Sequence, residues 1–562
     1  MSYRAPVEEI RFTLNHVVPM DRVAATERFA EAAPELVDAI LTEAGRMTTE
    51  IIAPLNRVGD ENPARLENGV VRASPGFDKG YRAIADGGWV GLAASPEHGG
   101  AGLPQVLNMA VNEMIAGACL ALQLNPLLTQ GQIEALEHFA SDELKSLYLP
   151  KLISGEWSGT MQLTEPQAGS DVGALTTRAE PNGDGSYAIT GQKIFITWGD
   201  SDLTPNICHA VLARLPDGPK GTKGISLFMV PKLLPDADGN PGAANNVRVV
   251  SLEHKMGIHA SPTCVMSYEG AQGWLIGEPH GGMTAMFTMM NNARLGVGMQ
   301  GVGVAEAALQ AAAAYAAERV QFGPIIRHPD VRRMLATARA EIFAARAIGL
   351  ACAASIDMAR ATGDADHAAR AALLTPIAKA YGTDVGSRVA DIGVQVHGGM
   401  GYIEETGAAQ FLRDVRITRI YEGTNGIQAM DLVGRKMMDG GAAAQALLDE
   451  VMDEARKIGG SVPDHAERIW NAAETLADAT QRLTERDTED RFAGAVPYLR
   501  AFARVLGGYY HLRAASAGDD ARRTLCRIYV DRILPQVDAD LAELELGFAD
   551  LRDLPDAALG LG

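Results

Sequence analysis

The residue whose type and setting most suggest chemistry is Glu422. Bulky Ile420 and Tyr421 precede it, and residues 423–426, Gly-Thr-Asn-Gly, form a flexible turn after it. Apolar surroundings disfavour the charged carboxylate and raise its pKa, which makes it a better base toward a weak carbon acid. For this stretch alone, an ordinary acid at a surface turn is the simpler interpretation, because perturbed acids mark functional sites only on average. The stretch therefore predicts a candidate base.

A second candidate is the loop at residues 161–171, Met-Gln-Leu-Thr-Glu-Pro-Gln-Ala-Gly-Ser-Asp. Its Ala-Gly-Ser part leaves backbone N–H groups and a hydroxyl free in a tight turn. Such a loop can hold a polar ring edge or a pyrophosphate. A structural turn with an Asp cap fits the same pattern.

Two helix ends carry the remaining candidates. At residues 319–323, Arg-Val-Gln-Phe-Gly, an arginine beside an aromatic suits a phosphate and a stacked adenine, although an arginine that complements a helix dipole is the simpler interpretation. At residues 395–402, Gln-Val-His-Gly-Gly-Met-Gly-Tyr, adjacent glycines allow a ligand close to the backbone. They also make an ordinary helix stop. His397 has no metal-ligand partner nearby, so no metal site is expected.

Composition and motifs exclude several functions. The net charge of −20 and the pI of about 5.1 argue against nucleic acid and against anionic lipid as partners. The five cysteines are scattered without metal-ligand spacing, as expected in a reducing compartment. No Walker A sequence, no GxGxxG before a helix and no GxSxG elbow occurs, although spacing does not exclude a Ser-His-Asp triad. The first residues have no apolar signal region, so we expect a cytoplasmic protein.

The elements that must position these residues change character along the chain. With 562 residues, two to four domains are expected. Residues 1–157 are predicted to be a helical domain, with amphipathic segments such as 31–58, 77–89, 106–123 and 141–149. Residues 158–285 are predicted to form an antiparallel β domain, because short Val/Ile/Phe-rich segments at 186–197, 208–215, 224–231 and 247–253 lie between turn residues. The fold class is therefore α+β.

Helical patterning returns after the β domain and continues to the C-terminus. Residues 286–440 are predicted to be a helical bundle that carries Glu422, with one long helix at 331–361. Residues 441–562 are predicted to be an additional helical module, with a clean apolar stripe from Ile469 to Leu483 and a kink at Pro535. The stretch 295–317 is long and carries a single charge, Glu306, but its Gly, Ala and Gln content favours a buried helix over a membrane span.

Five motifs occur in one order: LTEPQAGSD, GQKIFIT, ERVQFG, QVHGGMGY and RDVRITRIYEGTNGIQ. Together they resemble the acyl-CoA dehydrogenase family of flavoproteins over about residues 35–437. The length, the opening segment and the C-terminal module make the chain most similar to the long bacterial members, such as the 3-methylmercaptopropionyl-CoA dehydrogenases of dimethylsulfoniopropionate degradation.

The resemblance implies a site for each motif. FAD is expected between the β domain and the C-terminal helices of one subunit, with a neighbouring subunit completing the site in a homodimer or homotetramer. The flavin-binding residues of the same subunit would be Met161, Leu163, Thr164, Gly169, Ser170, Phe195, Ile196, Thr197 and Thr424. The partner subunit would supply Arg319, Gln321 and Phe322 near the adenine and Gln395, Gly398 and Gly399 near the pyrophosphate. The acyl-CoA would meet Ser170, Asn291, Arg294 and Gly423.

The resemblance also implies a reaction. Glu422 would take the α proton of an acyl-CoA thioester while its own backbone N–H and a flavin hydroxyl stabilise the thioester oxygen. The β hydrogen would leave as hydride to flavin N5, giving the trans-2-enoyl-CoA, with electron-transfer flavoprotein as the acceptor. An acyl-CoA oxidase using O2 and a non-catalytic flavoprotein are the alternatives within the same fold.

Four positions depart from the family pattern. Phe195 stands where many relatives have Trp, Gly426 replaces a frequent Gln, and Asn291 replaces a frequent Asp. Residues 259–263, His-Ala-Ser-Pro-Thr, vary a loop that often carries Arg. Phe195 keeps an aromatic face, so little change is expected there, whereas Asn291 leaves the CoA contacts near it in doubt.

Overall fold

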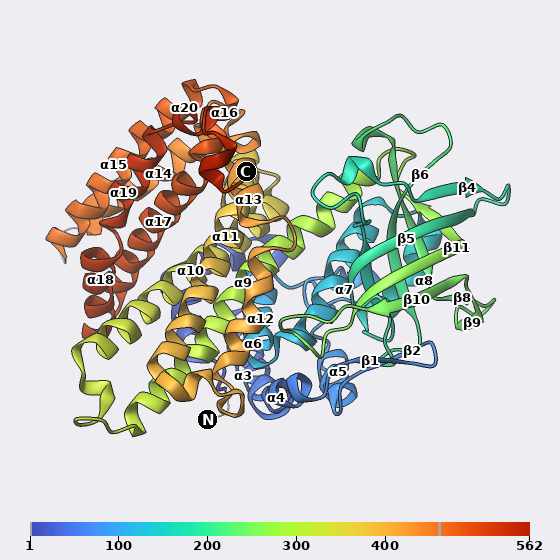
Figure 1. Cartoon of the computed structure of the whole chain (residues 1–562), viewed down its shortest axis with the longest axis horizontal. Coiled ribbons are helices and arrows are strands. Elements are labelled where there is room, and N and C mark those ends of the chain that lie inside the picture. Colours follow the sequence, from blue (N-terminus) through green and yellow to red (C-terminus); the bar gives the residue numbers. More distant parts are fainter. Residues whose placement is uncertain (1–2, 459–461, 562) are drawn as a thin grey trace.

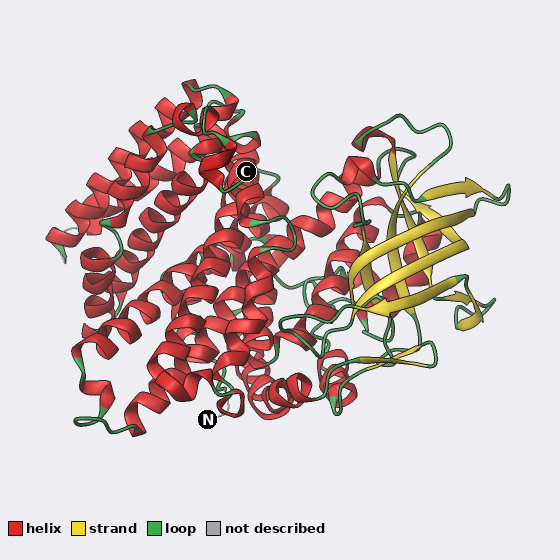
Figure 2. Ribbon diagram, viewed as in Figure 1, coloured by secondary structure: helices red, strands yellow, loops and turns green. Residues whose placement is uncertain are grey.

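The computed structural model describes residues 3–458 and 462–561. A helical bundle forms the centre, a β domain lies on one side of it and a second group of helices lies on the other (Figure 1, Figure 2). The α+β class predicted from the sequence is confirmed. All five cysteines are buried and unpaired.

The N-terminal part is helical, and apolar periodicity located most of its helices. One prediction was wrong: the helix expected at residues 106–123 breaks at Cys119, whose backbone is extended (φ −160°, ψ 98°), and a second helix continues to Phe139. The short hairpin of β1 (Arg65–Glu67) and β2 (Val70–Arg72) was not expected. The helices are α1 (Val7–His16), α2 (Met20–Ala24), α3 (Pro34–Met47), a π-helical turn (Thr48–Ile52), α4 (Ala53–Glu61), α5 (Phe77–Asp86), α6 (Gln105–Ala118), α7 (Leu120–Phe139) and α8 (Asp142–Ile153).

The β domain contains one seven-stranded sheet of order β10-β11-β5-β4-β6-β3, with β7 paired to β11 and β6. The prediction of a purely antiparallel sheet was wrong, because β3 and β4 both pair with β6 in parallel. The strands are β3 (Ser158–Gln162), β4 (Arg178–Pro181), β5 (Tyr187–Thr197), β6 (Ile207–Arg214), β7 (Ile225–Pro231), β10 (Val247–Leu252) and β11 (Thr263–Ile276), with a separate hairpin of β8 (Leu233–Pro235) and β9 (Pro241–Ala244).

The central bundle is built on close contact between α9 (Gly282–Glu318) and α11 (Ala365–His397). Glycines make this approach possible: a Cβ on Gly301 would lie 2.3 Å from the carbonyl oxygen of Gly382, and one on Gly298 would lie 2.7 Å from that of Ala378. The bundle is completed by α10 (Pro329–Thr362), α12 (Ala408–Val415) and α13 (Asn425–Val433).

The stretch 295–317 lies inside α9 and is largely buried there. By length and composition, α10 is the described helix that passes a test for a membrane span, with a mean hydropathy of 1.5 over an 18-residue window. Since 83% of that window is buried inside the protein, a core helix accounts for the same composition.

The C-terminal module packs its helices against α10, α11 and α13 (Figure 1). A bidentate ion pair between Arg370 of α11 and Glu450 of α14, joined by the hydroxyl of Tyr509, holds the two parts together. Pro535 separates two helices rather than kinking one. The module contains α14 (Ala442–Ile458), α15 (Pro463–Glu485), α16 (Thr488–Ala493), α17 (Ala495–Ala517), α18 (Asp520–Arg532), α19 (Gln536–Glu545) and α20 (Ala549–Arg552).

Candidate active site

Glu422 lies in the turn that leads into α13. Its backbone is left-handed (φ 55°), which is strained for a residue with a side chain, and Gly423 follows at φ 82°. The residue is half-buried, and burial raises the pKa of its carboxyl above the ordinary value, against the opposing charges of Arg294 and Lys379. Its backbone N–H makes no hydrogen bond within the described part of the chain. The turn therefore presents a carboxyl of raised pKa next to a free N–H donor.

A buried lysine fixes this turn. The ammonium of Lys379, on α11, donates to the carbonyl of Gly423 at 2.8 Å and to the side-chain oxygen of Asn425 at 2.9 Å. Burial lowers the pKa of Lys379 to about 7, while the charges of Glu422 and Asp384 oppose that shift. Lys379 thus holds the backbone that follows Glu422 and brings a positive charge toward the carboxyl of Glu422. No pattern in the sequence marks Lys379, because one lysine in an apolar helical stretch has no local signature.

Hydrogen bonds through α9 and α7 link Tyr421, next to Glu422, to the β domain. The hydroxyl of Tyr421 donates to Gln300 of α9, whose amide donates to Gln123 of α7 at 2.7 Å. Two residues away on α7, the carbonyl of Ala121 accepts from the indole of Trp198 at 3.0 Å. Trp198 directly follows β5, so the end of that strand and the turn of Glu422 are positioned by the same two helices.

The loop 164–170 is held by a buried ion pair that the sequence did not reveal. The carboxylate of Glu165 accepts from the ammonium of Lys193 at 2.8 Å and from the backbone and hydroxyl groups of Thr176 and Thr177. Although burial opposes ionisation, these donors lower the pKa of Glu165 to about 2, and burial lowers that of Lys193 to about 8. With Glu165 tied inside, Gly169 and Ser170 remain exposed. Apart from Gly169 and its two chain neighbours, no described residue has an atom within 4 Å of the Cβ position of Gly169.

Phe195 is turned outward by a bulge in β5. The register with β11 shifts between the Lys193 and Ile196 pairs, and Phe195 takes a left-handed conformation (φ 58°). Its side chain is 60% exposed, whereas Ile196 is buried and Thr197 is half-buried. Met161 is also buried, and Leu163 and Thr164 are half-buried. An exposed aromatic face thus lies on the strand that is bonded to the loop, since the N–H of Ile194 donates to the carbonyl of Thr164.

The residues predicted for the adenine and pyrophosphate lie at one end of the bundle. Arg319, Gln321 and Phe322 follow α9, and Gln395, Gly398 and Gly399 close α11. The two helix ends are joined by the stacked rings of Tyr315 and His397, 4.4 Å apart. All six are exposed, and Phe322 is completely so, at 104%.

The six residues at this end of the bundle cannot reach the β domain of their own chain. The first residue of α9, Gly282, touches β7, and α9 runs for 37 residues before it reaches Arg319. At 1.5 Å per residue, α9 separates Arg319 from β7 by ~55 Å. In Figure 1 the loop between α9 and α10 lies at the opposite side of the molecule from the sheet.

Two of the residues predicted to meet CoA, Asn291 and Arg294, lie on α9, and the charge of Arg294 acts on Glu422. Arg294 is 6% exposed, its Nη1 donates to Asn291 at 3.3 Å, and its Nε has no hydrogen-bond partner among the described residues. Thr424 caps α13, because its hydroxyl accepts from the N–H of Ile427 at 3.3 Å. Gly423 lies in the left-handed region (φ 82°), which favours glycine, and a Cβ there would lie 2.7 Å from the amide nitrogen of Gln428.

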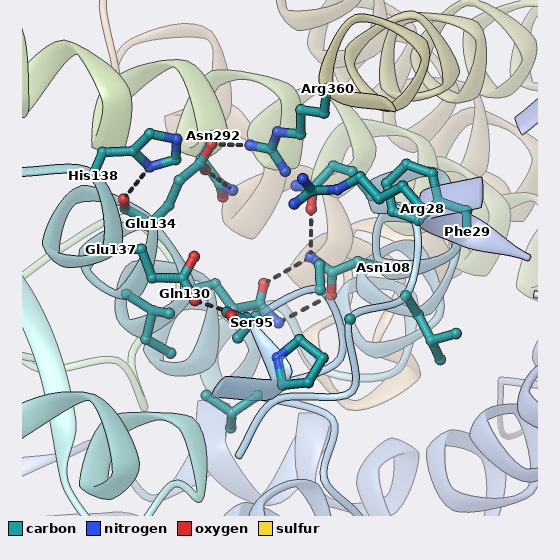
Figure 3. A pocket seen from close by; sticks show the side chains of 18 residues that line it. Arg28, Phe29, Ser95, Asn108, Gln130, Glu134, Glu137, His138, Asn292 and Arg360 are labelled. Atoms are coloured by element: carbon teal, nitrogen blue, oxygen red, sulfur yellow. Dashed lines mark hydrogen bonds and ion pairs between the residues drawn. The ribbon is translucent and has the colours of Figure 1, made fainter. Parts of the chain in front are cut away.

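A separate cavity of about 570 Å³ lies on another side of α9 (Figure 3). Arg360 and Asn292 both bind Glu134 at its wall, and Glu137 accepts from the N–H of Ser95. None of the predicted site residues lines it. This cavity is thus distinct from the site built around Glu422.

Four family models together match most of residues 37–555. The acyl-CoA dehydrogenase N-terminal, middle and C-terminal domains match residues 37–156, 160–271 and 280–438, and the acetyl-CoA dehydrogenase C-terminal-like domain matches residues 442–555. A 3-methylmercaptopropionyl-CoA dehydrogenase of Ruegeria pomeroyi is 44% identical over 91% of this chain and 90% of its own. The chain belongs to the acyl-CoA dehydrogenase family.

Two further relatives extend this result. A butyryl-CoA dehydrogenase of Syntrophomonas wolfei is 31% identical over 99% of both chains. The solved structure of butyryl-CoA dehydrogenase from Megasphaera elsdenii is 29% identical, with a TM-score of 0.60 over 71% of this chain and 97% of its own. The protein is an acyl-CoA dehydrogenase with FAD as its cofactor. The residues present suit that cofactor: the outward Phe195 offers a flat apolar face, and the hydroxyls of Thr164, Ser170 and Thr197 offer polar donors beside it.

Proposed function

We propose that this acyl-CoA dehydrogenase removes the α proton of its thioester substrate with Glu422 to give the trans-2-enoyl-CoA. The observation that carries the proposal is the coincidence, at one strained turn, of a carboxyl with a raised pKa and an unbonded backbone N–H. The carboxyl would take the α proton, and the N–H would donate to the thioester oxygen as negative charge develops there. When bound, FAD supplies the hydride acceptor, its N5, for the β hydrogen.

The remaining residues would bind and orient. Residues 164–170, residues 195–197 and Thr424 would hold the flavin of the same subunit. Arg294 and Asn291 would bind the CoA portion. Arg319, Gln321, Phe322, Gln395, Gly398 and Gly399 would come from a neighbouring subunit of a homodimer or homotetramer. The length of α9 and the exposed apolar side chains at its C-terminal end support this arrangement.

The substrate that we propose is a short or thioether acyl-CoA such as 3-methylmercaptopropionyl-CoA. The 44% identity to a 3-methylmercaptopropionyl-CoA dehydrogenase over nearly the whole chain supports it. We also propose electron-transfer flavoprotein as the acceptor and the cytoplasm as the location. A panel of acyl-CoA substrates compared by kcat/KM tests the chain length, and an optimum with long acyl chains would overturn this assignment.

The Glu422→Gln variant tests the base. It should bind FAD as the wild type does, because Gln has the same shape, but its flavin absorbance should not bleach when acyl-CoA is added without oxygen. Glu405→Gln, the same change at an exposed acid, should bleach normally. Normal bleaching by Glu422→Gln would refute the role of this residue.

Two measurements test the alternatives, an acyl-CoA oxidase and a non-catalytic flavoprotein. Peroxide formation with acyl-CoA and no added acceptor would identify an oxidase. A wild-type flavin that acyl-CoA does not bleach would identify a non-catalytic flavoprotein.

A further inference from the structure

Positive side chains gather where α13 ends. Arg294 from α9 and Arg435 after α13 both approach the ring of Phe287, with their Cζ atoms 6.0 and 5.5 Å from its centroid. Lys436 follows Arg435, and burial, together with the charges of Arg435 and Arg294, lowers its pKa. The carboxylate of Asp431 binds Arg435. This local excess of positive charge stands out in a chain of net charge −20 and suits an anionic ligand.

The C-terminal module reaches the same place through its short helix α16. Arg491 donates from Nη1 to the carbonyl of Val433 at 3.5 Å, while its Nε is buried without a partner in the part of the chain that the structure describes. The ring of Phe492 lies 3.5 Å from the Cβ position of Gly434, yet its side chain is still 37% exposed. Helix α16 packs against α13, and Figure 1 shows it at the top of the module.

The cluster lies at a fixed distance from the base. Helix α13 starts directly after Thr424 and ends at Val433, so its nine residues separate Glu422 from the cluster by ~14 Å. Arg294 belongs to the cluster, and its charge also acts on Glu422. An extended pantetheine arm, which joins the thioester of CoA to its phosphates, spans a length of this order.

We propose that α16 completes the binding site for the nucleotide end of acyl-CoA, with Arg491, Arg435 and Lys436 binding phosphates and Phe492 packing against the adenine. The inference rests on the proposed function, since it places the thioester at Glu422. Guanidinium groups pair with phosphate oxygens through charge-assisted hydrogen bonds, and an exposed aromatic ring accepts a purine face. The module of residues 441–562 thereby acquires a role in substrate binding.

The test compares one acyl group on two carriers. For the wild type, Arg491→Ala, Phe492→Ala and Arg523→Ala, kcat/KM is measured with the acyl-CoA and with the same acyl group on pantetheine, which lacks the phosphates and the adenine. Arg523, on α18, is exposed and paired with Asp520, so its variant is the matched control. We expect the ratio of kcat/KM for the acyl-CoA to kcat/KM for the acyl-pantetheine to fall roughly tenfold in Arg491→Ala. In Arg523→Ala this ratio should stay at the wild-type value. Phe492→Ala should lower it as well.

If α16 has only a structural role, the kcat/KM measurements give a different result. Loss of packing would lower kcat/KM for both carriers together, so an unchanged ratio in both α16 variants would overturn the inference. It would leave the proposed function intact, because the wild type would still oxidise both thioesters. If the wild type oxidises neither, the proposed function fails first and the inference falls with it.

Discussion

At the residue scale, the site depends on opposing effects on one carboxyl. Burial raises the pKa of Glu422, and the charges of Arg294 and Lys379 pull it back. Burial has the larger effect, which suits a base that must act on a carbon acid. Lys379 also binds the carbonyl of Gly423, so the same side chain adjusts the base and fixes its turn.

Replacement of Lys379 by Met should shift the pH dependence of the reaction. Removal of the positive charge raises the pKa of Glu422 further, and since the base works deprotonated, the acid limb of kcat/KM should move to higher pH by about one unit. Because the pKa of Lys379 is about 7, its charge is present mainly below that pH, where the difference from wild type should be largest. The measurement is kcat/KM against pH with saturating FAD.

The control for this change is Lys79→Met, which removes an exposed lysine from α5. It should leave the acid limb in place. A profile for Lys379→Met that is lowered equally at every pH would show that the lysine acts only through the backbone of the turn.

The sequence predicted Glu422 but not its partners. A carboxyl between Tyr421 and glycine is visible in one local stretch, and the family motifs include it. Lys379 and Gln300 come from helices far away in the chain, and Lys193 meets Glu165 only after β5 has paired with the rest of the sheet. Such contacts depend on tertiary packing, which periodicity does not encode.

At the element scale, the same dependence on tertiary packing explains which strands the sequence predicted. Alternating Val, Ile and Phe segments predicted β5, β6, β7 and β10. The longest strand, β11, was missed, because Gly270 and Gly273 interrupt its pattern and its register shifts twice. Parallel pairing of β3 with β6 was missed since the intervening chain forms two other strands and a loop.

The exposed segment after α9 supplies a prediction at this scale. Phe322→Asp places a charge on a fully exposed ring that we assign to the subunit interface, so gel filtration should show a smaller species and the purified protein should retain less FAD. Leu36→Asp, at an exposed apolar residue of α3, is the control and should change neither. An unchanged elution volume together with full FAD content would contradict the assignment.

At the scale of the whole molecule, a buried ion triad joins the N-terminal part to the bundle. Arg346 of α10 binds Glu113 of α6 at 2.7 Å and Glu306 of α9 at 2.9 Å, and all three are buried. Burial raises the pKa of Glu113, whereas Arg346 and Arg339 together hold that of Glu306 below its ordinary value. The alignment of α9, which carries Arg294 and Gln300 into the site, therefore depends on charges far from the chemistry.

Arg346→Met should destabilise the whole chain, because it leaves two carboxylates buried beside an apolar side chain. Breaking such a pair costs roughly 3–5 kcal/mol, although Arg339 still pairs with Glu306 at 3.1 Å and limits the loss. In the variant both carboxyls should have folded-state pKa values above the unfolded value, so the folded state binds more protons and its stability falls as pH rises. The apparent melting temperature should therefore lie several degrees below wild type at pH 8 and closer to it at pH 5. Arg333→Met, an exposed pair on the same helix, should melt like the wild type at both pH values, and equal melting of the two variants would refute the importance of the triad.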